Sequence, residues 1–427
     1  MNKLAVPDSS SIVRQQISNG LVVLVHENHS NPSVVLSGYL RGGAVLETPA
    51  QSGLASFTAS MLRRGTATRS FADINESLEA VGASLSVGSG RHITDFGGKC
   101  LSEDLPLLLD IMTDVLTHPV FPEEHLEKVR GQVLTGLQER DNDTRSMASL
   151  TFHQLLFGAD HPYGRSPVGE RETVIGITQP DLVDFYQRHY GPAAGALVVV
   201  GDVQAAAVLA QIEQLLGGWQ HAPVTANLPP VAAVNASVQR RVAIPGKTQS
   251  DIVLGWLGPQ RSDPAYYAVS LANTILGRFG MMGRLGENVR EKQGLAYYAY
   301  SAAESGEGPG AWMAIAGVNP ANVERAIASM LEEIVRLVEE PIPSEEMADS
   351  QAFMTGIVPL RLETNQGVAD TLSDMEHFNL GLDFLKHYPA FINGLTADQL
   401  QAAAQRFLHP DRYALAVAGP PETPAEN

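Results

Sequence analysis

Residues 53–66, GLASFTASMLRRGT, have the spacing of one amphipathic helix, because apolar residues recur at i, i+3, i+7 and i+8. The apolar stripe consists of Leu54, Phe57, Met61 and Leu62. The other face carries Ser56, Ala59, Ser60 and Arg63. Residues three and four apart are neighbours on a helix surface, so this second face is a continuous strip with almost no reactive group. It is either an ordinary packing face of small residues or a catalytic helix whose catalytic residues have been replaced.

Outward from this helix, the sequence contains one unit twice, at a spacing of about 220 residues. FPEEHLEKVRGQVLTGLQER from Phe121 is similar to IPSEEMADSQAFMTGIVPLR from Ile342, and each begins with a Pro that can start a helix. Each is followed by a polar break and a second predicted helix. DLVDFYQRHYGPAAGALVVVGD from Asp181 is similar to DQLQAAAQRFLHPDRYALAVAGP from Asp398, a helix followed by a Val/Ala-rich strand. The chain is therefore predicted to be a duplicated domain.

The junction between the two copies is rich in Pro and Ala and has no helical periodicity, which predicts a linker at residues 223–237. The predicted domains are then 1–222 and 238–427. Each copy mixes alternating strands with amphipathic helices, and GLVVLVHENHSNPSVVLSGYLRGG at the start reads as strand, turn and strand. The expected fold class is α+β, with two homologous domains that each have a mostly antiparallel sheet and helices packed on one face.

Composition excludes several classes of partner and site. Asp and Glu total 47 against 29 Lys and Arg, a net charge of −18, which argues against nucleic acid and anionic membranes as partners. It suits basic or unfolded peptides, although acidity also serves solubility. With Cys100 as the single cysteine, neither a disulfide within the chain nor a thiolate zinc site is possible. No apolar run reaches the 18 residues that a membrane span needs.

Other familiar motifs fail. PGKTQS at 245–250 has Arg241 where a nucleotide-binding loop needs its first Gly, and GRFGMMGRL lacks dinucleotide-binding spacing. No two histidines lie at i and i+4, so no dedicated metal site is expected. The first residues, MNKLAVPDSSSIVRQQ, lack the apolar stretch of a signal peptide. The expected location is cytoplasmic if the chain is as synthesised, and periplasmic if a signal peptide was removed.

The most informative stretch is GRLGENVREKQGLAYYAYS, residues 283–301. It predicts a helix ending around Lys292, with Gly294 just beyond its end, and then an alternating strand. It resembles the C-terminal-half motif of the insulinase/pitrilysin family of zinc peptidases, which includes the mitochondrial processing peptidase. GLASFTASMLRRGT resembles the zinc helix of that family at almost every position except the functional ones. The resemblance covers nearly the whole chain, which has the length of the family's small duplicated-domain subunits.

The resemblance implies that the zinc site is degenerate. The family's helix carries H-x-x-E-H, two zinc-binding histidines and a Glu that acts as general base, and here those positions are Ser56, Ala59 and Ser60. The remaining ligand, a Glu on a later helix, falls on Gly136. A Gly inside a helix costs about 1 kcal/mol relative to Ala, and close packing of another helix would be the ordinary reason for it. No base that could activate a Ser nucleophile is recognisable near Ser56 or Ser60.

The other half of the family's site is present. Arg290 and Tyr297 match the family's Arg and Tyr, seven residues apart in REKQGLAY, which point at the zinc site from the zinc-free half. A guanidinium and a tyrosine hydroxyl can donate hydrogen bonds to a carbonyl oxygen that becomes an oxyanion. The structural alternative is a helix-end ion pair for Arg290 and packing against the sheet for Tyr297. Tyr298 should point to the opposite face of the strand.

The expected function follows from this resemblance. The chain is predicted to be a catalytically inactive subunit of a heterodimeric zinc peptidase, without zinc and without activity of its own. Zinc is expected in a homologous active partner, and a peptide or unfolded polypeptide is the expected substrate. Arg290 and Tyr297 would act in trans on the partner's site. The alternative is a homodimeric, non-catalytic peptide-binding or scaffold protein of the same fold, and an independent hydrolase is the weakest hypothesis.

Overall fold

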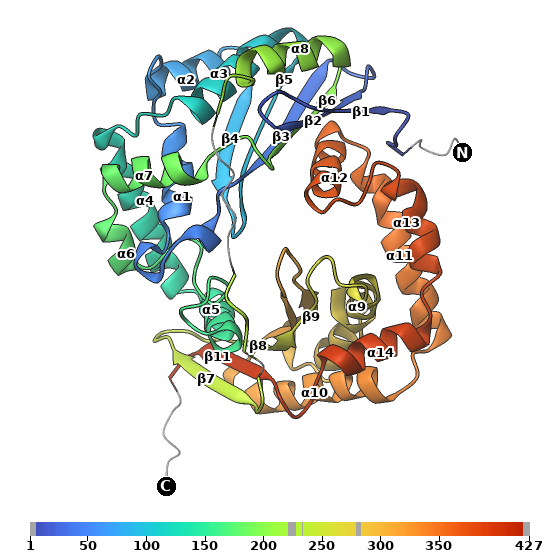
Figure 1. The fold of residues 1–427 in the computed structure, drawn as a ribbon. Coiled ribbons are helices and arrows are strands. Elements are labelled where there is room, and N and C mark those ends of the chain that lie inside the picture. The colour runs from blue at the N-terminus through green and yellow to red at the C-terminus, as the bar shows by residue number, and fades with distance from the viewer. Residues whose placement is uncertain (1–5, 221–227, 233, 279–282, 422–427) are drawn as a thin grey trace. The chain divides into compact units, whose positions relative to one another are not determined.

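The computed structural model describes residues 6–220, 228–232, 234–278 and 283–421 (Figure 1). They group into two compact units. The first comprises Met1–Leu137, Ser166–Asn227 and Ile357–Tyr388, and the second comprises Gln138–Arg165, Leu228–Gly356 and Pro389–Asn427. Residues 221–227 and 233 of the junction lie outside the described residues. The linker at 223–237 and the domains 1–222 and 238–427 stay predictions.

The first unit is built on a six-stranded sheet with the order β1-β2-β6-β3-β5-β4. β2 and β6 run parallel, and the other neighbouring strands run antiparallel. The strands are β1 Ile12–Gln16, β2 Val22–Glu27, β3 Ser33–Arg41, β4 Ser84–Ser89, β5 Ile93–Leu101 and β6 Ala196–Gly201. β6, ALVVVG, is buried throughout, as its continuous run of apolar residues predicts for a central strand.

Among the described residues, side chains of this sheet take part in two hydrophobic clusters. The larger one joins the sheet to α1, α3, α7 and α8, and the other joins it to α12. The helices lying wholly in this unit are α1 Leu54–Leu62, α2 Phe71–Glu79, α3 Leu105–Thr117, α6 Arg171–Gly176, α7 Gln179–His189, α8 Ala205–Leu216 and α12 Asn365–His377. Short 3₁₀ turns lie at Ala44–Leu46, Pro49–Gln51 and Ser102–Asp104. The side chains of these clusters are mostly aliphatic, with several aromatic rings, and their burial stabilises the unit.

The second unit has a five-stranded sheet with the order β7-β11-β8-β10-β9. Among its described strands, β7 and β11 run parallel, and the other neighbouring pairs run antiparallel. Its strands are β7 Val238–Ala243, β8 Ser250–Leu257, β9 Ala296–Ala303, β10 Ala311–Val318 and β11 Ala414–Gly419. Its helices are α5 Thr144–Phe157, α9 Tyr266–Asn273, α10 Val323–Glu339 and α14 Ala397–Phe407. Among the described residues, π-helical segments lie at Thr274–Arg278 (η4) and Gly286–Lys292 (η6), and a 3₁₀ turn lies at Pro320–Asn322.

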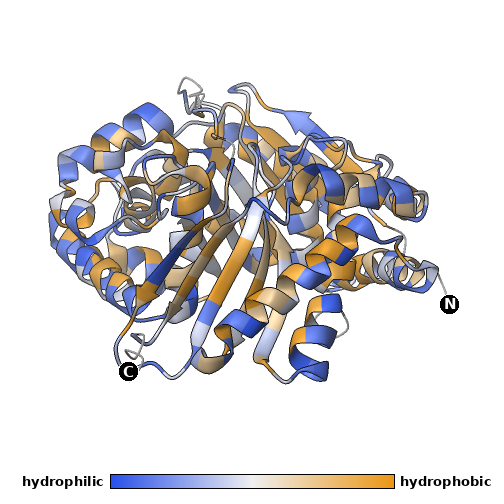
Figure 2. Ribbon diagram, turned by 90° about the horizontal axis from the view of Figure 1, so that it is seen from below, coloured by the Kyte–Doolittle hydropathy of each residue, from blue (hydrophilic) through white to orange (hydrophobic). Residues whose placement is uncertain are grey.

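In the described part of the chain, α4 Glu123–Asp141, α11 Ser344–Arg361 and α13 Phe384–Asn393 each have residues assigned to both units. Figure 2 shows orange, apolar strands flanked by helices that carry both blue and orange positions, the pattern expected for helices with one buried face. The α+β fold class is confirmed, with two sheets that are mostly antiparallel. The first sheet has helices on both faces and not on one, because alternate residues of β2 and β6 pack against different sets of helices. No helix of the described residues is long and apolar enough to cross a membrane.

The repeated helix pairs have an arrangement that the sequence did not predict. The predicted pairs exist as α4 with α5 and α11 with α12. α5, from the first half of the sequence, packs on β7, β8 and β11 of the second unit, and α12, from the second half, packs on β3 and β6 of the first unit. Each sheet therefore completes its core with a helix from the other half of the chain.

Candidate functional site

α1 is the helix that the sequence predicted from residues 53–66, and its apolar stripe is buried as expected. It begins at Gly53, whose φ of 93° is strained for any other residue. A Cβ at this position would also lie 2.8 Å from the Val168 carbonyl oxygen. The buried carboxylate of Glu47 accepts hydrogen bonds from the Gly53 and Ala55 amides at 3.1 and 2.6 Å. A carboxylate at the first turn satisfies free amides and suits the helix dipole, so α1 is firmly anchored.

The second face of α1 holds no group that could ligate zinc. Ala59 is 1% exposed, and Ser60 is exposed. The Ser60 hydroxyl donates to the Ser56 carbonyl oxygen at 2.9 Å, so it is satisfied by its own helix. Zinc in proteins takes imidazole, thiolate or carboxylate ligands, and these residues do not fit that donor set. Across the described ranges no group of three or more His, Cys, Asp or Glu side chains is placed to hold a metal ion.

Gly136, the fourth position that the resemblance assigns to the metal site, lies on the exposed side of α4. A Cβ built there would meet no atom within 4 Å in the described structure. The expectation that this Gly serves the close packing of another helix is therefore wrong. Among the described residues, the space around a Cβ at this position is open.

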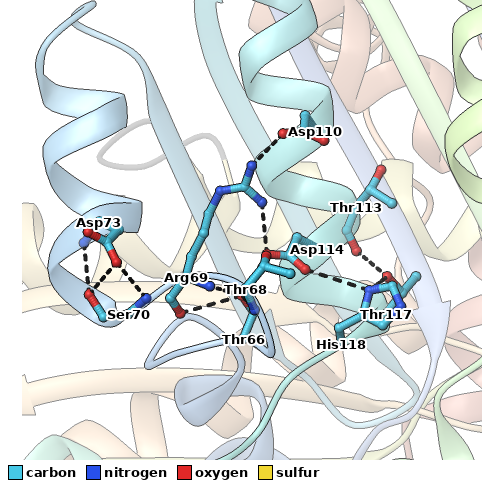
Figure 3. Close-up of polar contacts among 10 residues, drawn as sticks. All are labelled: Thr66, Thr68, Arg69, Ser70, Asp73, Asp110, Thr113, Asp114, Thr117 and His118. Carbon is cyan, nitrogen blue, oxygen red and sulfur yellow. Dashed lines mark hydrogen bonds and ion pairs between the residues drawn. The ribbon is translucent and has the colours of Figure 1, made fainter.

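The loop after α1 is held to α3 by a buried carboxylate (Figure 3). Asp114 accepts hydrogen bonds from the Thr66 and Thr68 hydroxyls at 2.5 and 2.7 Å, and from the Arg69 guanidinium at 2.8 Å. Arg69 also reaches Asp110 at 2.5 Å. Burial raises the pKa of Asp114, but these hydrogen bonds outweigh burial and leave the pKa below its usual value. The loop after α1 is thus hydrogen-bonded to α3 through Asp114, although α1 itself carries no zinc-binding side chain.

Arg290 lies on η6, the π-helical segment Gly286–Lys292. The predicted helix end near Lys292 is confirmed, and Gly294 follows it with a φ of 61°. The predicted alternative, a helix-end ion pair, exists in a loose form, because the Arg290 Nε lies 3.4 Å from Glu291 and the side chain remains 37% exposed. π-helical turns occur often at functional sites.

The segment η6 is held by a hydrogen bond to the buried carboxylate of Glu333. The Asn288 amide donates to Glu333 Oε1 at 2.6 Å, and Glu333 on α10 is 2% exposed. Arg336, one turn along α10, pairs with the same carboxylate at 2.9 Å, so its charge is compensated. This support leaves Arg290 at the surface of its unit.

Tyr297 is 80% exposed, so the structural alternative in which it packs against the sheet is wrong. Its hydroxyl makes no hydrogen bond within the described part of the chain. β9, which carries it, packs against η6, so Tyr297 and Arg290 lie on neighbouring elements of one unit. Tyr298 has other partners: its hydroxyl donates to Asp251, and its ring lies 5.1 Å from the Arg145 guanidinium. That Tyr298 points to the opposite face of the strand stays a prediction.

Sequence reasoning missed the residues beneath this surface. Asp251 is 1% exposed as the second residue of a buried strand, SDIVLGWL, and it accepts hydrogen bonds from Thr144 and Tyr298. A carboxylate inside an apolar run is itself a signal, because a buried charge needs dedicated partners. Gly317 on β10 lies opposite Asp251 in the sheet. Its role could not be recognised from the sequence without knowing this strand register.

Comparisons with known proteins agree with this geometry. Residues 22–162 match the family model described as insulinase, peptidase family M16, and residues 176–354 match the model described as the peptidase M16 inactive domain. An uncharacterized zinc protease of Streptomyces coelicolor is 28% identical over 418 residues, covering 96% of this chain and 90% of the relative. The beta subunit of the mitochondrial-processing peptidase of Lentinula edodes is 24% identical over 426 residues, covering 94% and 89%.

Among solved structures, a peptidase M16 inactive domain from Pseudomonas fluorescens superposes with a TM-score of 0.90 at 26% identity, covering 96% of this chain and 98% of that one. A protease from Helicobacter pylori shares the fold, with a TM-score of 0.88 at 19% identity and coverage of 97% and 100%. The two family models and these likenesses extend along both sheets, and the chain belongs to the insulinase family of peptidases, family M16.

Proposed function

We propose that this chain is the non-catalytic subunit of a heterodimeric zinc peptidase. A homologous partner with an intact H-x-x-E-H helix would hold the zinc, and this chain would supply Arg290 and Tyr297 to the partner's site. The observation that carries the proposal is a contrast within the chain. The four metal and base positions hold Ser56, Ala59, Ser60 and Gly136, whereas the Arg and Tyr of the second half are present, Arg290 partly exposed and Tyr297 largely so.

The exposure of Tyr297 supports a role outside its own unit. It is the most exposed of the large hydrophobic residues in the described ranges, at 80%. Tyr is favoured where an apolar ring and a polar tip are both used, as in contacts with a partner or a peptide. Its unused hydroxyl and the exposed Arg290 guanidinium are both hydrogen-bond donors.

The proposed chemistry needs only hydrogen bonding from these two residues. During peptide cleavage the carbonyl oxygen of the scissile bond becomes negatively charged, and donors aimed at that oxygen lower the barrier. Tyr297 would donate through its hydroxyl and Arg290 through its planar guanidinium. Neither residue gains or loses a proton in this role. The substrate class is a peptide or an unfolded polypeptide, which also fits the net charge of −18 if its segments are basic.

The test is to produce this chain together with an M16 homologue of the same organism that carries H-x-x-E-H. Co-purification as a stable complex that cleaves peptides is the first expected result, with neither chain active alone. In that complex Tyr297→Phe should lower kcat about 100-fold to 1,000-fold, the usual effect of losing one oxyanion donor. Assembly should be unchanged, since the ring remains. Arg290→Lys should also lower turnover, because Lys lacks the planar fork.

Tyr300→Phe is the matched control, because Tyr300 lies on the same strand and bonds to Arg145 within its own unit. It should leave kcat unchanged. If Tyr297→Phe assembles normally and retains full activity, the proposed role in trans is wrong. The homodimeric scaffold alternative would then be favoured.

A further inference from the structure

The strand that carries Tyr297 is irregular at that residue. On β9, Tyr298 pairs with Gly317 of β10, but the next pair is Ala296 with Val318. Two residues of β9 therefore span the step that one residue makes on β10, and Tyr297 has no partner across the ladder. This is a β-bulge, a feature that turns a side chain to a new direction and is common beside active sites.

A row of three residues crosses the sheet beside this bulge. Asp251 on β8 is opposite Gly317 on β10, and Gly317 is opposite Tyr298 on β9. The Tyr298 hydroxyl donates to the Asp251 carboxylate, so the ring must span the central strand. A Cβ on Gly317 would lie 2.5 Å from Tyr298 Cε1, well inside contact distance. Only Gly at this position lets the ring cross.

The acceptor of this hydrogen bond is itself fixed. Asp251 is 1% exposed, and its carboxylate also accepts from the Thr144 hydroxyl at 2.5 Å and from the Gln249 amide at 3.2 Å. A buried carboxylate with several donors is costly to move, because any displaced oxygen would be left unsatisfied. Burial and the neighbouring carboxylate both raise the pKa of Tyr298, so its hydroxyl stays protonated and donates at any ordinary pH.

We infer that the hydrogen bond from Tyr298 to Asp251 is a positioning device that holds the bulge and thereby aims the Tyr297 side chain. Tyr297 has no hydrogen bond of its own in the described structure, so its backbone sets its direction. Tyr298, the next residue in the chain, is hydrogen-bonded across the sheet to the buried Asp251 carboxylate. This hydrogen bond restrains the backbone beside Tyr297, which has no partner in the ladder. The expected effect on catalysis rests on the proposed function of Tyr297. The bulge and the hydrogen bond that supports it do not depend on that function.

The first arm of the test measures the bulge in the isolated full-length chain. Hydrogen exchange of the peptide covering residues 293–303 is followed for the native protein, Tyr298→Phe and Tyr300→Phe. Tyr298→Phe retains the ring and removes only the donor, so exchange at 296–298 should become at least about tenfold faster. Tyr300→Phe should leave that exchange unchanged, because Tyr300 pairs regularly with Ile315. Equal protection in all three proteins would overturn the inference, whatever Tyr297 does.

The second arm measures kcat and KM in the reconstituted complex. Tyr298→Phe should lower kcat about 10-fold to 100-fold with little change in KM, as expected when a donor is misplaced. The double variant Tyr297→Phe/Tyr298→Phe should be no worse than Tyr297→Phe alone, because Tyr298 acts through Tyr297. Independent effects would multiply instead. Gly317→Ala, which pushes the ring off its path, should reproduce the effect of Tyr298→Phe.

The outcomes separate the two proposals. If Tyr297→Phe impairs turnover but Tyr298→Phe does not, the proposed function stands and the positioning role is wrong. If the single effects multiply in the double variant, Tyr298 acts on general stability and the positioning role is also wrong. If Tyr297→Phe has no effect, the proposed function fails, and the exchange measurement alone decides whether Tyr298 holds the bulge.

Discussion

Ser56, Ala59 and Ser60, which stand at the positions of the family's ligands and base in α1, do not appear among the described residues with a buried, unsatisfied side-chain atom. Ala59 is 1% exposed, and its side chain is a methyl group that needs no hydrogen-bond partner. The Ser60 hydroxyl donates a hydrogen bond to the carbonyl oxygen of Ser56. A buried carboxylate without a metal would instead need a compensating partner or a shifted pKa. The helix therefore needs no ion for its own stability, and its anchor at Glu47 is independent of this face.

Gly136 allows a direct test of the open space on α4. We expect Gly136→Ala to stabilise the isolated chain by about 0.5–1 kcal/mol, because Ala restricts the unfolded chain and favours a helix. The new Cβ would meet nothing within 4 Å in the described structure. Thermal denaturation of both proteins measures the difference. Gly38→Ala is the contrasting control, since its Cβ would lie 2.4 Å from the Phe96 ring. A lower midpoint for Gly136→Ala would contradict the open space.

At the scale of elements, much of the site could be predicted from local pattern. The helix of residues 53–66, the helix end near Lys292 and the strand after Gly294 follow from apolar spacing and a Gly beyond the helix end, and all are present. The π-helical turn and the bulge could not be predicted. Their supports, Glu333 for η6 and Asp251 for β9, are 45 and 47 residues away from the groups they bind. Such contacts have no local sequence signature.

The loop after α1 gives a prediction about pH. The pKa of Asp114 is lowered in the folded state, so its network stabilises the protein above the usual Asp pKa, 3.8, and the stabilisation is lost as pH falls below it. Asp114→Asn removes the charge that Arg69 pairs with. We expect it to cost about 1.5–3 kcal/mol at pH 7, the range for hydrogen bonds to a charged group.

The check is the difference in thermal midpoint between the native chain and Asp114→Asn at pH 7 and near pH 3. The difference should be large at pH 7 and should shrink at the lower value. Asp110→Asn is the control, because Asp110 is 50% exposed and its loss should matter little at either pH. A difference that is the same at both pH values would show that the charge of Asp114 contributes nothing.

At the scale of the whole molecule, metal content separates this chain from its proposed partner. We expect the purified chain to hold no stoichiometric zinc and to cleave no peptide, because Ser, Ala and Gly occupy the ligand and base positions. Elemental analysis of the isolated chain and of the complex measures this. The complex should hold about one zinc per two chains, bound through the partner. One tightly bound zinc per isolated chain, with activity that a chelator abolishes, would contradict the proposed function.

The repeat predicted two similar halves, but it could not predict which sheet each second helix covers. The helical pattern fixes the apolar face of α12 and α5, and an apolar face fits either sheet equally well in sequence terms. The contacts decide it: α12 covers β3 and β6, and α5 covers β8 and β11. The cluster under α12 includes Leu24, Val35, Val198, Ala369 and Leu372, all at most 2% exposed. Each half of the sequence therefore lacks part of its own core.

Because each half of the sequence supplies a core helix to the sheet of the other half, we expect that the halves cannot fold separately. Residues 1–237 alone would expose the apolar strands that α12 covers, and each buried aliphatic side chain lost costs about 1.5–3 kcal/mol. We expect this fragment to aggregate or to bind a hydrophobic dye without a cooperative thermal transition. Co-expression with residues 238–427 should yield a soluble complex of both fragments. The control is the intact chain with a protease site inserted in 223–237 and cut after folding, which should keep both pieces together. If residues 1–237 alone were soluble and unfolded cooperatively, α12 would not be needed for the first sheet, because that sheet would then bury enough apolar surface with its own helices.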